Sequence, residues 1–186
     1  MSQGGTYSQF DEDRVLIDLI GKLPDIPRQF VEIGAGDGSE NCTRILLDYG
    51  WRGVWVDPLL ADVGTPPGVT AVARKFTLAE ALESDVSKTG VLSIDIDGND
   101  YHLWEAFGPG PAIVIIEAQI QRPEDLAWVM PYDPAYEWDH KSHDCGASVF
   151  SMIELGKRMG YSLVARPSNP HSPNLFFCKD ELVSKL

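Results

Sequence analysis

Three alternating glycines and a downstream acid are the residues of this chain whose types and spacing most directly suggest chemistry. Gly34, Gly36 and Gly38 follow a strongly apolar run, and Asp57 ends the next such run. Glycine permits a sharp turn and lets a ligand approach the backbone closely. An acid that ends the following strand can accept hydrogen bonds from a ribose diol. The pattern predicts a nucleoside-binding site over residues 30–57.

The charges around the glycines discriminate between nucleosides. Glu32 precedes the turn and Asp37 lies within it, whereas the turn contains no Lys or Arg. Carboxylates repel phosphate groups. The third glycine also comes one residue too early for the dinucleotide fingerprint, because position 39 is Ser. These residues favour a positively charged sulfonium nucleoside over NAD or ATP.

A second group of polar residues follows two other apolar runs. Asp95 and Asp97 come after one run, and Glu117 and Gln119 come after the next. Oxygen ligands that converge from adjacent strands suit Mg²⁺, Mn²⁺ or Ca²⁺. We therefore name these four residues as candidate metal ligands. The alternative is that residues 97–100 cap the following helix while Asp95 binds the nucleoside cofactor.

Histidines supply the candidates for a general base. His102 is nearest to the acids in sequence, and His140 and His143 lie in a long aromatic segment. Neutral imidazole can deprotonate a hydroxyl, including one held by a metal ion. A purely structural role is open for each histidine. We name His102 and His143, together with Asp97, as the candidate catalytic residues.

The overall charge restricts the partners. Fifteen Lys and Arg against 28 Asp and Glu give a formal charge of −13, which disfavours binding to nucleic acid and to anionic membrane surfaces. We expect a small-molecule substrate and leave a homodimer open. The first six residues do not resemble a signal peptide, which favours a cytoplasmic protein. The three cysteines have no metal or disulfide spacing and are expected to be isolated buried thiols.

An alternating series of strands and helices must position these groups. Strand-like apolar runs are predicted at 28–33, 53–56, 69–73, 90–96, 112–117, 161–166 and 175–178. Helices are predicted at 11–23, 39–49, 77–82 and 148–159, with Thr77 as a candidate cap of the third. This alternation is typical of an α/β fold, with a parallel sheet covered on both faces. Only residues 167–173 join the last two strands, so that pair is expected to be antiparallel.

Residues 119–146 interrupt this alternation. The segment is rich in aromatic residues and contains three prolines. Long loops in compact domains are usually functional, so we predict a lid or a binding loop inserted into one domain that spans residues 1–186. The alternative is an ordered surface flap that packs on the edge of the sheet.

Several of these residues also match a known family. Residues 31–38, VEIGAGDG, resemble the first motif of class I S-adenosylmethionine (SAM) dependent methyltransferases, and Asp57 looks like their ribose-binding acid. Residues 41–44, 49–54, 92–101, 115–117, 146–148 and 160–161 are similar to the FkbM-like group of that class. The resemblance implies a Rossmann-like, doubly wound sheet with strand order 3-2-1-4-5-7-6 and an antiparallel strand 7.

The resemblance further implies an activity and a cofactor site. The cofactor would be SAM, and the reaction would be methyl transfer to a hydroxyl of a small molecule, such as a sugar or another diol. The acids Asp95, Asp97 and Glu117 also resemble the site of metal-dependent O-methyltransferases, a likeness that implies assistance from Mg²⁺ or another divalent cation. Gly34 to Gly38 would line the methionine moiety, and Phe76 and Thr77 would flank adenine. The expected cofactor-binding residues are Glu32, Gly34, Ala35, Gly36, Asp37, Gly38, Asn41, Asp57, Phe76, Thr77 and Asp95.

Two other functions stay open from the sequence. Residues 94–98 resemble the nucleophile motif of haloacid-dehalogenase phosphatases, in which Asp95 would be the nucleophile and Asp97 the acid. That family continues with Thr, whereas this chain has Asn99. Relatives in the FkbM-like group usually place Tyr-Asn where this chain has Ala118 and Gln119. This departure suggests a SAM-binding partner protein without catalytic activity.

Overall fold

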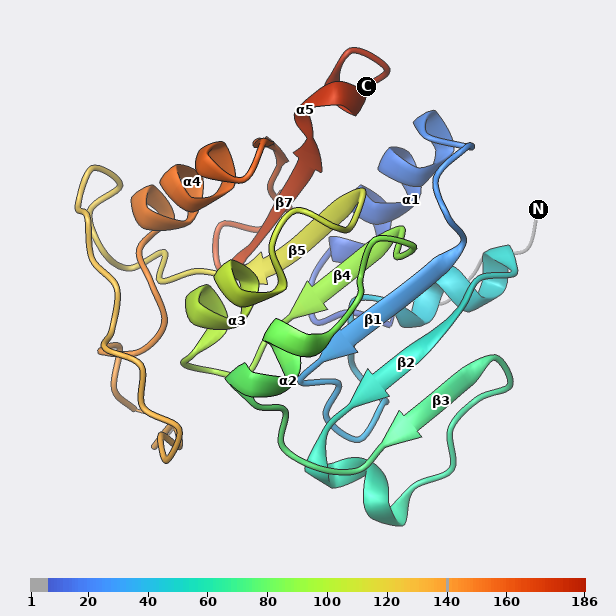
Figure 1. Ribbon diagram of the computed structural model, residues 1–186, viewed down its shortest axis with the longest axis horizontal. Helices are drawn as coiled ribbons and strands as arrows, with labels where there is room; N and C mark the ends of the chain where they lie inside the picture. The colour runs from blue at the N-terminus through green and yellow to red at the C-terminus, as the bar shows by residue number, and fades with distance from the viewer. Residues whose placement is uncertain (1–6, 140) are drawn as a thin grey trace.

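Seven strands form one mixed sheet in the computed structural model, which describes residues 7–139 and 141–186 (Figure 1). The strands are β1 (Gln29–Ile33), β2 (Arg52–Val56), β3 (Val69–Val72), β4 (Val91–Ile94), β5 (Ile113–Glu117), β6 (Tyr161–Ala165) and β7 (Asn174–Lys179). Their order is β3-β2-β1-β4-β5-β7-β6, and β7 runs antiparallel to both neighbours. The predicted fold class and strand order are confirmed.

Helices cover both faces of this sheet. The helices are α1 (Glu12–Lys22), α2 (Leu78–Glu83), α3 (Asp100–Phe107), α4 (Val149–Arg158) and α5 (Asp180–Val183), with 3₁₀ turns η1 (Arg44–Tyr49) and η2 (Pro58–Asp62). Figure 1 shows α2, α3 and α4 in front of the sheet and α1 behind it. The hydrophobic core divides in the same way, because α1 and η1 contribute to one cluster and α2, α3 and α4 to the other.

The central strands are apolar on both faces, as buried parallel strands require. In β5, Ile113 and Ile115 belong to the core cluster that contains α1. Val114 and Ile116 belong to the cluster that contains α2, α3 and α4. All four side chains are fully buried. The near-continuous apolar runs in the sequence therefore identified the strands correctly.

One predicted helix is wrong. Residues 39–49 do not form an α-helix, and only Arg44–Tyr49 are helical, as a 3₁₀ turn. The Glu32 carboxylate accepts hydrogen bonds from the backbone N–H groups of Cys42 and Thr43, and Asp37 accepts one from Ser39. These hydrogen bonds hold residues 39–43 in an irregular conformation. The helix therefore begins only at Arg44.

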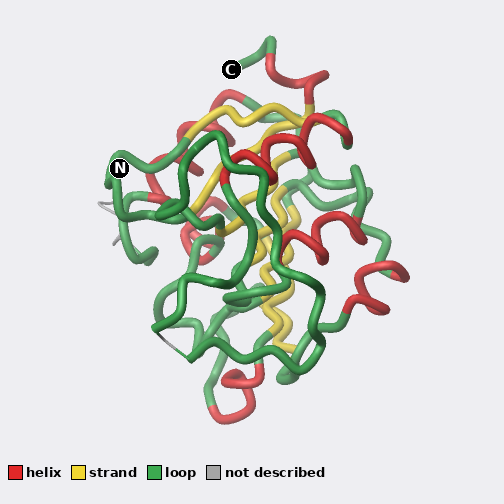
Figure 2. The backbone as a smooth tube through the Cα atoms, turned by 90° about the vertical axis from the view of Figure 1, so that its left-hand side faces the viewer, coloured by secondary structure: helices red, strands yellow, loops and turns green. Residues whose placement is uncertain are grey.

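Residues 119–146 are largely irregular, as predicted. Their only β contacts among the described residues are single bridges from Gln119 to Ser148 and from Val129 to Ala147. Figure 2 shows this segment as long loops in front of the sheet. The three cysteines are free and buried, as expected. No described helix is both long and apolar enough to cross a membrane.

Candidate functional site

A cavity of about 590 Å³ lies at the carboxyl ends of the central strands. Gly34 and Gly36 line it from the turn after β1, Asp57 from the end of β2, and Asp95 and Asp97 from the end of β4. Ligands of open α/β sheets bind at this edge. The cavity therefore brings the predicted nucleoside site and the predicted acidic site into one space.

Gly34 lines the cavity at the point where the turn after β1 packs against the ends of β2 and β4. Its φ is +86°, and a Cβ atom there would lie 1.6 Å from the backbone oxygen of Asp95. Its N–H donates to Val56 O at 2.9 Å. Only glycine allows the β1 turn to touch the ends of β2 and β4 together. The glycine requirement seen in the sequence is thus explained by close backbone packing between three strands.

Asp57 joins the glycine turn to η2. Its Oδ2 accepts from Gly36 N at 3.0 Å, and its Oδ1 accepts from Leu59 N at 2.8 Å. Each carboxylate oxygen can accept more than one hydrogen bond, so both keep acceptor capacity toward the cavity. The geometry supports a carboxylate that is held in place and still able to accept from a diol.

Phe76 and Thr77 line the cavity after β3. The Phe76 ring stacks on Phe107 at the end of α3, with ring centroids 5.5 Å apart and planes 14° apart. Thr77 is the N-cap of α2 and forms a capping box with Glu80. Both side chains are therefore anchored by neighbouring helices, and the predicted Thr77 cap is confirmed.

Five of the predicted cofactor residues do not line this cavity: Glu32, Ala35, Asp37, Gly38 and Asn41. Glu32 is buried and binds the backbone of Cys42 and Thr43, and burial raises its pKa to about 7. Asp37 is exposed, and its hydrogen bonds from Ser39 lower its pKa.

The other three lie behind the turn. Ala35 is fully buried, and a Cβ atom on Gly38 would lie 2.7 Å from the Trp55 ring. Asn41 is buried, and its side-chain amide has no hydrogen-bond partner among the described residues. The contact of these three residues with a cofactor stays a prediction.

Three carboxylates meet beside the cavity. Asp95, Asp100 and Glu117 offer oxygen atoms within 4.8 Å of one another. Burial, followed by the charge of Asp100, raises the pKa of Asp95 to about 8. Burial also raises the pKa of Asp100 to about 6 and that of Glu117 well above its usual value. The group therefore favours a shared proton or a bound cation.

The membership of this group differs from the predicted metal set. Asp100, the first residue of α3, takes part, although its carboxylate already accepts from Ile96 N and Gly98 N at 2.8 Å. Asp97 lies outside the group, lines the cavity and has a φ of +58°. Gln119 donates from Nε2 to Cys145 Sγ at 3.1 Å. Asp100 could have been found from its place in the sequence. It is an acid in the first turn of the helix that follows Asp95, the acid at the end of β4.

The two described candidate histidines do not line the cavity. His102 donates from Nε2 to Met130 O at 2.8 Å and packs edge-on against Tyr101 and Tyr132. His143 is exposed. His140 lies outside the described residues. The catalytic assignment of His102 and His143 stays a prediction, and Asp97 is the one candidate of that set at the cavity wall.

The long segment closes one side of the cavity. Tyr132, Pro134, Tyr136, Glu137 and Trp138 all line it. Two contacts join the segment to neighbouring parts of the chain. Asn99 exchanges hydrogen bonds with the backbone of Asp133 at 2.8 and 3.2 Å, and Lys75 pairs with Glu137 at 2.5 Å. Motion of the segment as a lid stays a prediction.

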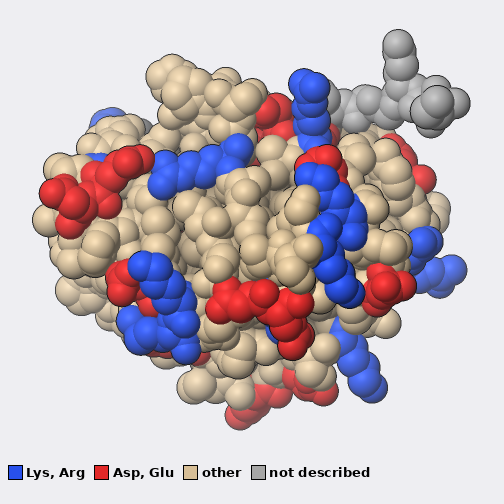
Figure 3. All heavy atoms as spheres, turned by 90° about the horizontal axis from the view of Figure 1, so that it is seen from above, with Lys and Arg blue, Asp and Glu red and all other residues tan. Residues whose placement is uncertain are grey.

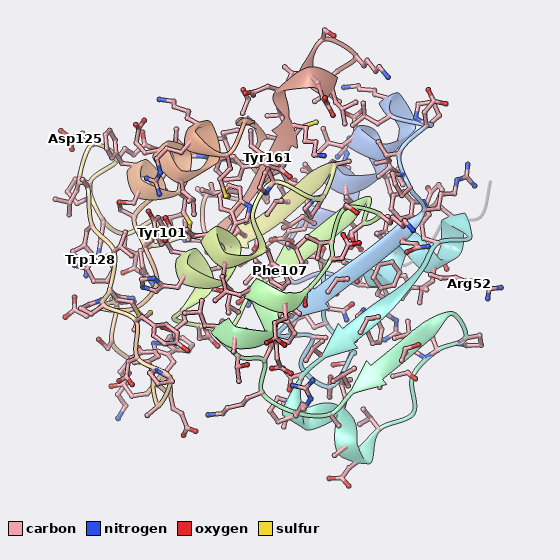
Figure 4. All side chains as sticks on the ribbon, viewed as in Figure 1. Arg52, Tyr101, Phe107, Asp125, Trp128 and Tyr161 are labelled. Carbon is pink, nitrogen blue, oxygen red and sulfur yellow. The ribbon has the colours of Figure 1, made fainter. Side chains whose placement is uncertain are left out.

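The outer part of the same segment has a structural role. The guanidinium of Arg122 lies 3.5 Å from the centroid of the Trp128 ring and pairs with Asp144. Figure 4 shows Trp128 and Asp125 at the outer edge of the molecule, on the segment that follows β5. Trp128 therefore braces the segment rather than lining the cavity.

The cavity is acidic. Its lining includes five acids, Glu40, Asp57, Asp95, Asp97 and Glu137, against two bases, Arg74 and Lys75. Sequence reasoning missed both bases, although they directly precede Phe76. The face in Figure 3 likewise carries Lys and Arg among its Asp and Glu. In the lining of the cavity, acids outnumber bases.

No protein-family model matches this sequence, and no curated protein sequence matches it. Solved structures do match. The methyltransferase domain of bacterial CtHen1-C superposes with a TM-score of 0.54 at 14% identity, over 91% of this chain and 98% of that one. The fold is that of this methyltransferase domain.

Two longer proteins share the same fold. LaPhzM matches with a TM-score of 0.51 at 14% identity, over 88% of this chain and 55% of its own. A candidate O-methyltransferase from Nostoc punctiforme matches with a TM-score of 0.53 at 12% identity, over 90% and 55%. The chain spans about half the length of these two proteins. Identities this low show a common fold and nothing finer.

Proposed function

We propose that this chain is a SAM-dependent methyltransferase that acts on a hydroxyl of a small molecule. One observation carries the proposal: a single cavity joins Gly34, Gly36 and Asp57 to Asp95 and Asp97, beneath the segment 119–146. The nucleoside end can hold a cofactor, and the acidic end leaves space for an acceptor. A fold shared with a methyltransferase domain supports the same function.

The residues present fit SAM. Asp57 would accept hydrogen bonds from the ribose, Phe76 and Thr77 would flank the adenine, and Gly34 and Gly36 would give the methionine moiety access to the backbone. An acidic cavity suits a sulfonium cation and disfavours phosphates. When bound, SAM supplies an electrophilic methyl group.

The protein contributes chiefly by orientation and exclusion of water. Displacement at a methyl group needs the acceptor oxygen held in line, which a closed cavity favours. Tyr132, Tyr136 and Trp138 cover the cavity and limit access of solvent. The acceptor hydroxyl must also lose a proton, for which Asp97 is the candidate at the cavity wall. His102 and His143 would act only if the segment 119–146 rearranged.

The finer assignment to the FkbM-like group rests on the sequence. Residues 92–101, which include Asp95, Asp97 and Asp100, are one of the segments that carry that resemblance. In the structure, they form the end of β4 and the start of α3, beside the cavity. The corresponding proposal for the acceptor is a sugar or another compound with neighbouring hydroxyl groups.

A divalent cation fits the same acids. Asp95, Asp100 and Glu117 provide the hard oxygen ligands that Mg²⁺ and Mn²⁺ prefer. Bound there, the ion would lower the pKa of an acceptor hydroxyl. Removal of divalent ions with EDTA should then lower both the melting temperature and the methyl-transfer rate, and added Mn²⁺ should restore both. An unchanged melting curve and rate would exclude the metal.

The function is tested by transfer of a labelled methyl group from SAM to small-molecule pools of sugars, polyols and phenols. We expect label in at least one pool and loss of that transfer in the Asp57→Ala variant. Binding of S-adenosylhomocysteine without transfer to any pool would indicate the non-catalytic partner instead. Turnover of p-nitrophenyl phosphate that is lost in Asp95→Asn would indicate the phosphatase.

A further inference from the structure

The first turn of α3 contacts the segment 119–146 through two side chains. Asn99, the N-cap residue, donates from Nδ2 to Asp133 O at 2.8 Å and accepts from Asp133 N at 3.2 Å. His102 bonds Met130 O at 2.8 Å through Nε2. The N-cap residue and the third helical residue lie on the same side of a helix. The two side chains therefore hold Met130 and Asp133 along one side of α3.

This part of α3 is firmly fixed in the molecule. The Asp100 carboxylate is buried and accepts from Ile96 N and Gly98 N at 2.8 Å, so it joins the helix to the turn after β4. Leu103 and Trp104 are fully buried in the core cluster that also contains α2 and α4. Side chains carried by a rigid element can hold their partners with little freedom of position.

The turn that Asn99 holds is exposed to solvent. Residues 131–135 are all exposed. Asp133 Oδ1 accepts from Ala135 N at 2.9 Å, and Asp133 O accepts from Tyr136 N at 3.1 Å. These bonds shape the turn but do not attach it to the helix. A turn with so little buried surface opens easily, so its position depends on the side chains that hold it from α3.

The same turn forms a wall of the cavity. Tyr132, Pro134 and Tyr136 line the cavity from it. The Tyr132 ring packs edge-on against His102, with ring centroids 5.6 Å apart. A Cβ atom on Gly98 would lie 2.6 Å from the Tyr136 ring, so that ring packs directly on the backbone before α3. The wall therefore keeps its shape only while the turn stays against α3.

Two other contacts at this wall have different roles. The Tyr136 hydroxyl hydrogen-bonds Cys145, which belongs to the same segment. Lys75 pairs with Glu137, but both side chains are exposed, and exposed ion pairs contribute little. Neither contact joins the turn to α3.

The contact with Met130 also indicates what His102 does. A backbone carbonyl oxygen only accepts hydrogen bonds, so Nε2 of His102 carries the proton. The ring is half-buried and does not line the cavity. A general base must come within hydrogen-bond reach of the hydroxyl that it deprotonates. This geometry suits a side chain that holds the backbone better than one that removes a proton.

We propose that Asn99 and His102 are positioning residues that hold the turn 133–136 against α3 and thereby form the wall that the methyl acceptor contacts. Neither side chain takes part in proton transfer. This inference rests on the proposed function, which supplies the acceptor. A wall that is in place before the acceptor arrives binds it more tightly than a wall that must first close.

Hydrogen exchange followed by mass spectrometry on residues 130–136 tests the docking of the turn without any ligand. Asn99→Ala and His102→Ala should each speed exchange there about fivefold or more, because each removes hydrogen bonds that keep the turn closed. Asn169→Ala and His171→Ala are the matched controls, since both lie in the loop between β6 and β7 and outside the cavity. They should leave exchange of residues 130–136 unchanged.

Kinetics with an acceptor found by labelled methyl transfer test the effect on binding. Asn99→Ala should raise the KM for the acceptor about tenfold and change kcat by less than about threefold, because fewer molecules have the wall in place. The affinity for S-adenosylhomocysteine should stay the same.

Two variants of His102 distinguish positioning from proton transfer. His102→Ala should raise the KM as Asn99→Ala does. His102→Gln should recover most of that loss, because its amide can donate to Met130 O although it cannot serve as a base. A general base at His102 would instead lower kcat by about 100-fold or more in both variants.

The outcomes separate this inference from the proposed function. Unchanged exchange of residues 130–136 in both alanine variants would refute the inference whatever the function. Failure of S-adenosylhomocysteine to bind, or transfer to no acceptor, would refute the proposed function and with it the acceptor role of the wall. If transfer occurs, an unchanged KM in Asn99→Ala, or a loss of kcat of about 100-fold in His102→Gln, would refute the inference alone.

Discussion

Asp57 is the residue on which the cofactor assignment depends most. The side chain lines the cavity and simultaneously accepts from the backbone of Gly36 and Leu59. Its position at the end of the second strand was visible in the sequence because strand-end acids have a recognisable spacing from a glycine turn. Its second role, as the N-cap of η2, could not be seen in the sequence, because no pattern predicted that 3₁₀ turn.

Asp57→Ala should weaken binding of S-adenosylhomocysteine by about 10- to 100-fold, which corresponds to the roughly 1.5–3 kcal/mol of a hydrogen bond to a charged group. Calorimetric titration measures the change. Asp125→Asn, an exposed acid outside the cavity, should bind like the unaltered protein. Equal affinity of Asp57→Ala and the unaltered protein would show that Asp57 does not hold the ribose.

Glu32 shows what a sequence pattern leaves out. An acid in an otherwise apolar strand was a clear anomaly, and we predicted that it contacts the cofactor. In the structure, its carboxylate binds Cys42 and Thr43, and the Thr43 hydroxyl in turn accepts from Trp55 Nε1 at 2.9 Å. These partners follow from the path of an irregular loop, which local periodicity does not encode.

The raised pKa values predict how stability changes with pH. The pKa values of Glu32, Asp95 and Asp100 are raised to about 7, 8 and 6 by burial, so the folded state binds protons more tightly than the unfolded state. Their stabilising contribution is complete below the unfolded pKa near 4 and is lost as pH rises through about 6–8. Between about pH 5 and pH 8, the melting temperature of the cofactor-free protein should fall by roughly 5 °C or more.

Thermal melts across that range, followed by circular dichroism, measure this decline. Glu32→Gln should make it shallower because the side chain no longer titrates. Glu83→Gln, at an exposed site on α2, should leave it unchanged. A melting temperature that rises from pH 5 to pH 8, or an identical slope in Glu32→Gln, would contradict the assignment.

At the scale of elements, the strands were predictable and the turns between them were only partly so. Buried parallel strands are apolar throughout, so β4 and β5 stand out from composition alone. The Thr77 cap and its helix were also predicted correctly. The helix predicted over residues 39–43 is absent because the side chains of Glu32 and Asp37 accept hydrogen bonds from the backbone there, in competition with helix formation.

The segment 119–146 forms one side of the cavity. Its length and aromatic content predicted a functional loop, and five of its residues line the cavity. The individual contacts, such as Asn99 with Asp133, depend on how the segment folds over α3 and could not be read from the sequence. Its ion pair from Lys75 to Glu137 is exposed and contributes little to closure.

Gly98→Ala should displace Tyr136, because the new Cβ atom would lie 2.6 Å from the ring. We expect the KM for the acceptor to rise by about tenfold, the size of a single lost packing contact, while the affinity for S-adenosylhomocysteine stays unchanged. Gly64→Ala is the matched control, since a Cβ atom there meets no neighbour within 4 Å. An unchanged KM in Gly98→Ala would mean that Tyr136 does not contact the acceptor.

At the scale of the whole molecule, the net charge and the strand order both explain features of the cavity. The formal charge of −13 made anionic partners unfavourable from the sequence, and in the structure acids outnumber bases in the lining of the cavity. The strand order places β1 beside both β2 and β4, so the glycine turn contacts Asp57 and Asp95 together. The grouping of Asp100 with Asp95 and Glu117 required this three-dimensional arrangement and was missed in the sequence.

Calorimetric titration of the unaltered protein with S-adenosylhomocysteine tests the central claim most directly, with ATP and NAD titrated under the same conditions. An acidic cavity with a glycine turn and a ribose acid predicts saturable binding of S-adenosylhomocysteine to one site per chain, and no heat of binding from either phosphate-containing nucleotide. Absence of S-adenosylhomocysteine binding at millimolar concentration, or tighter binding of ATP or NAD, would contradict it.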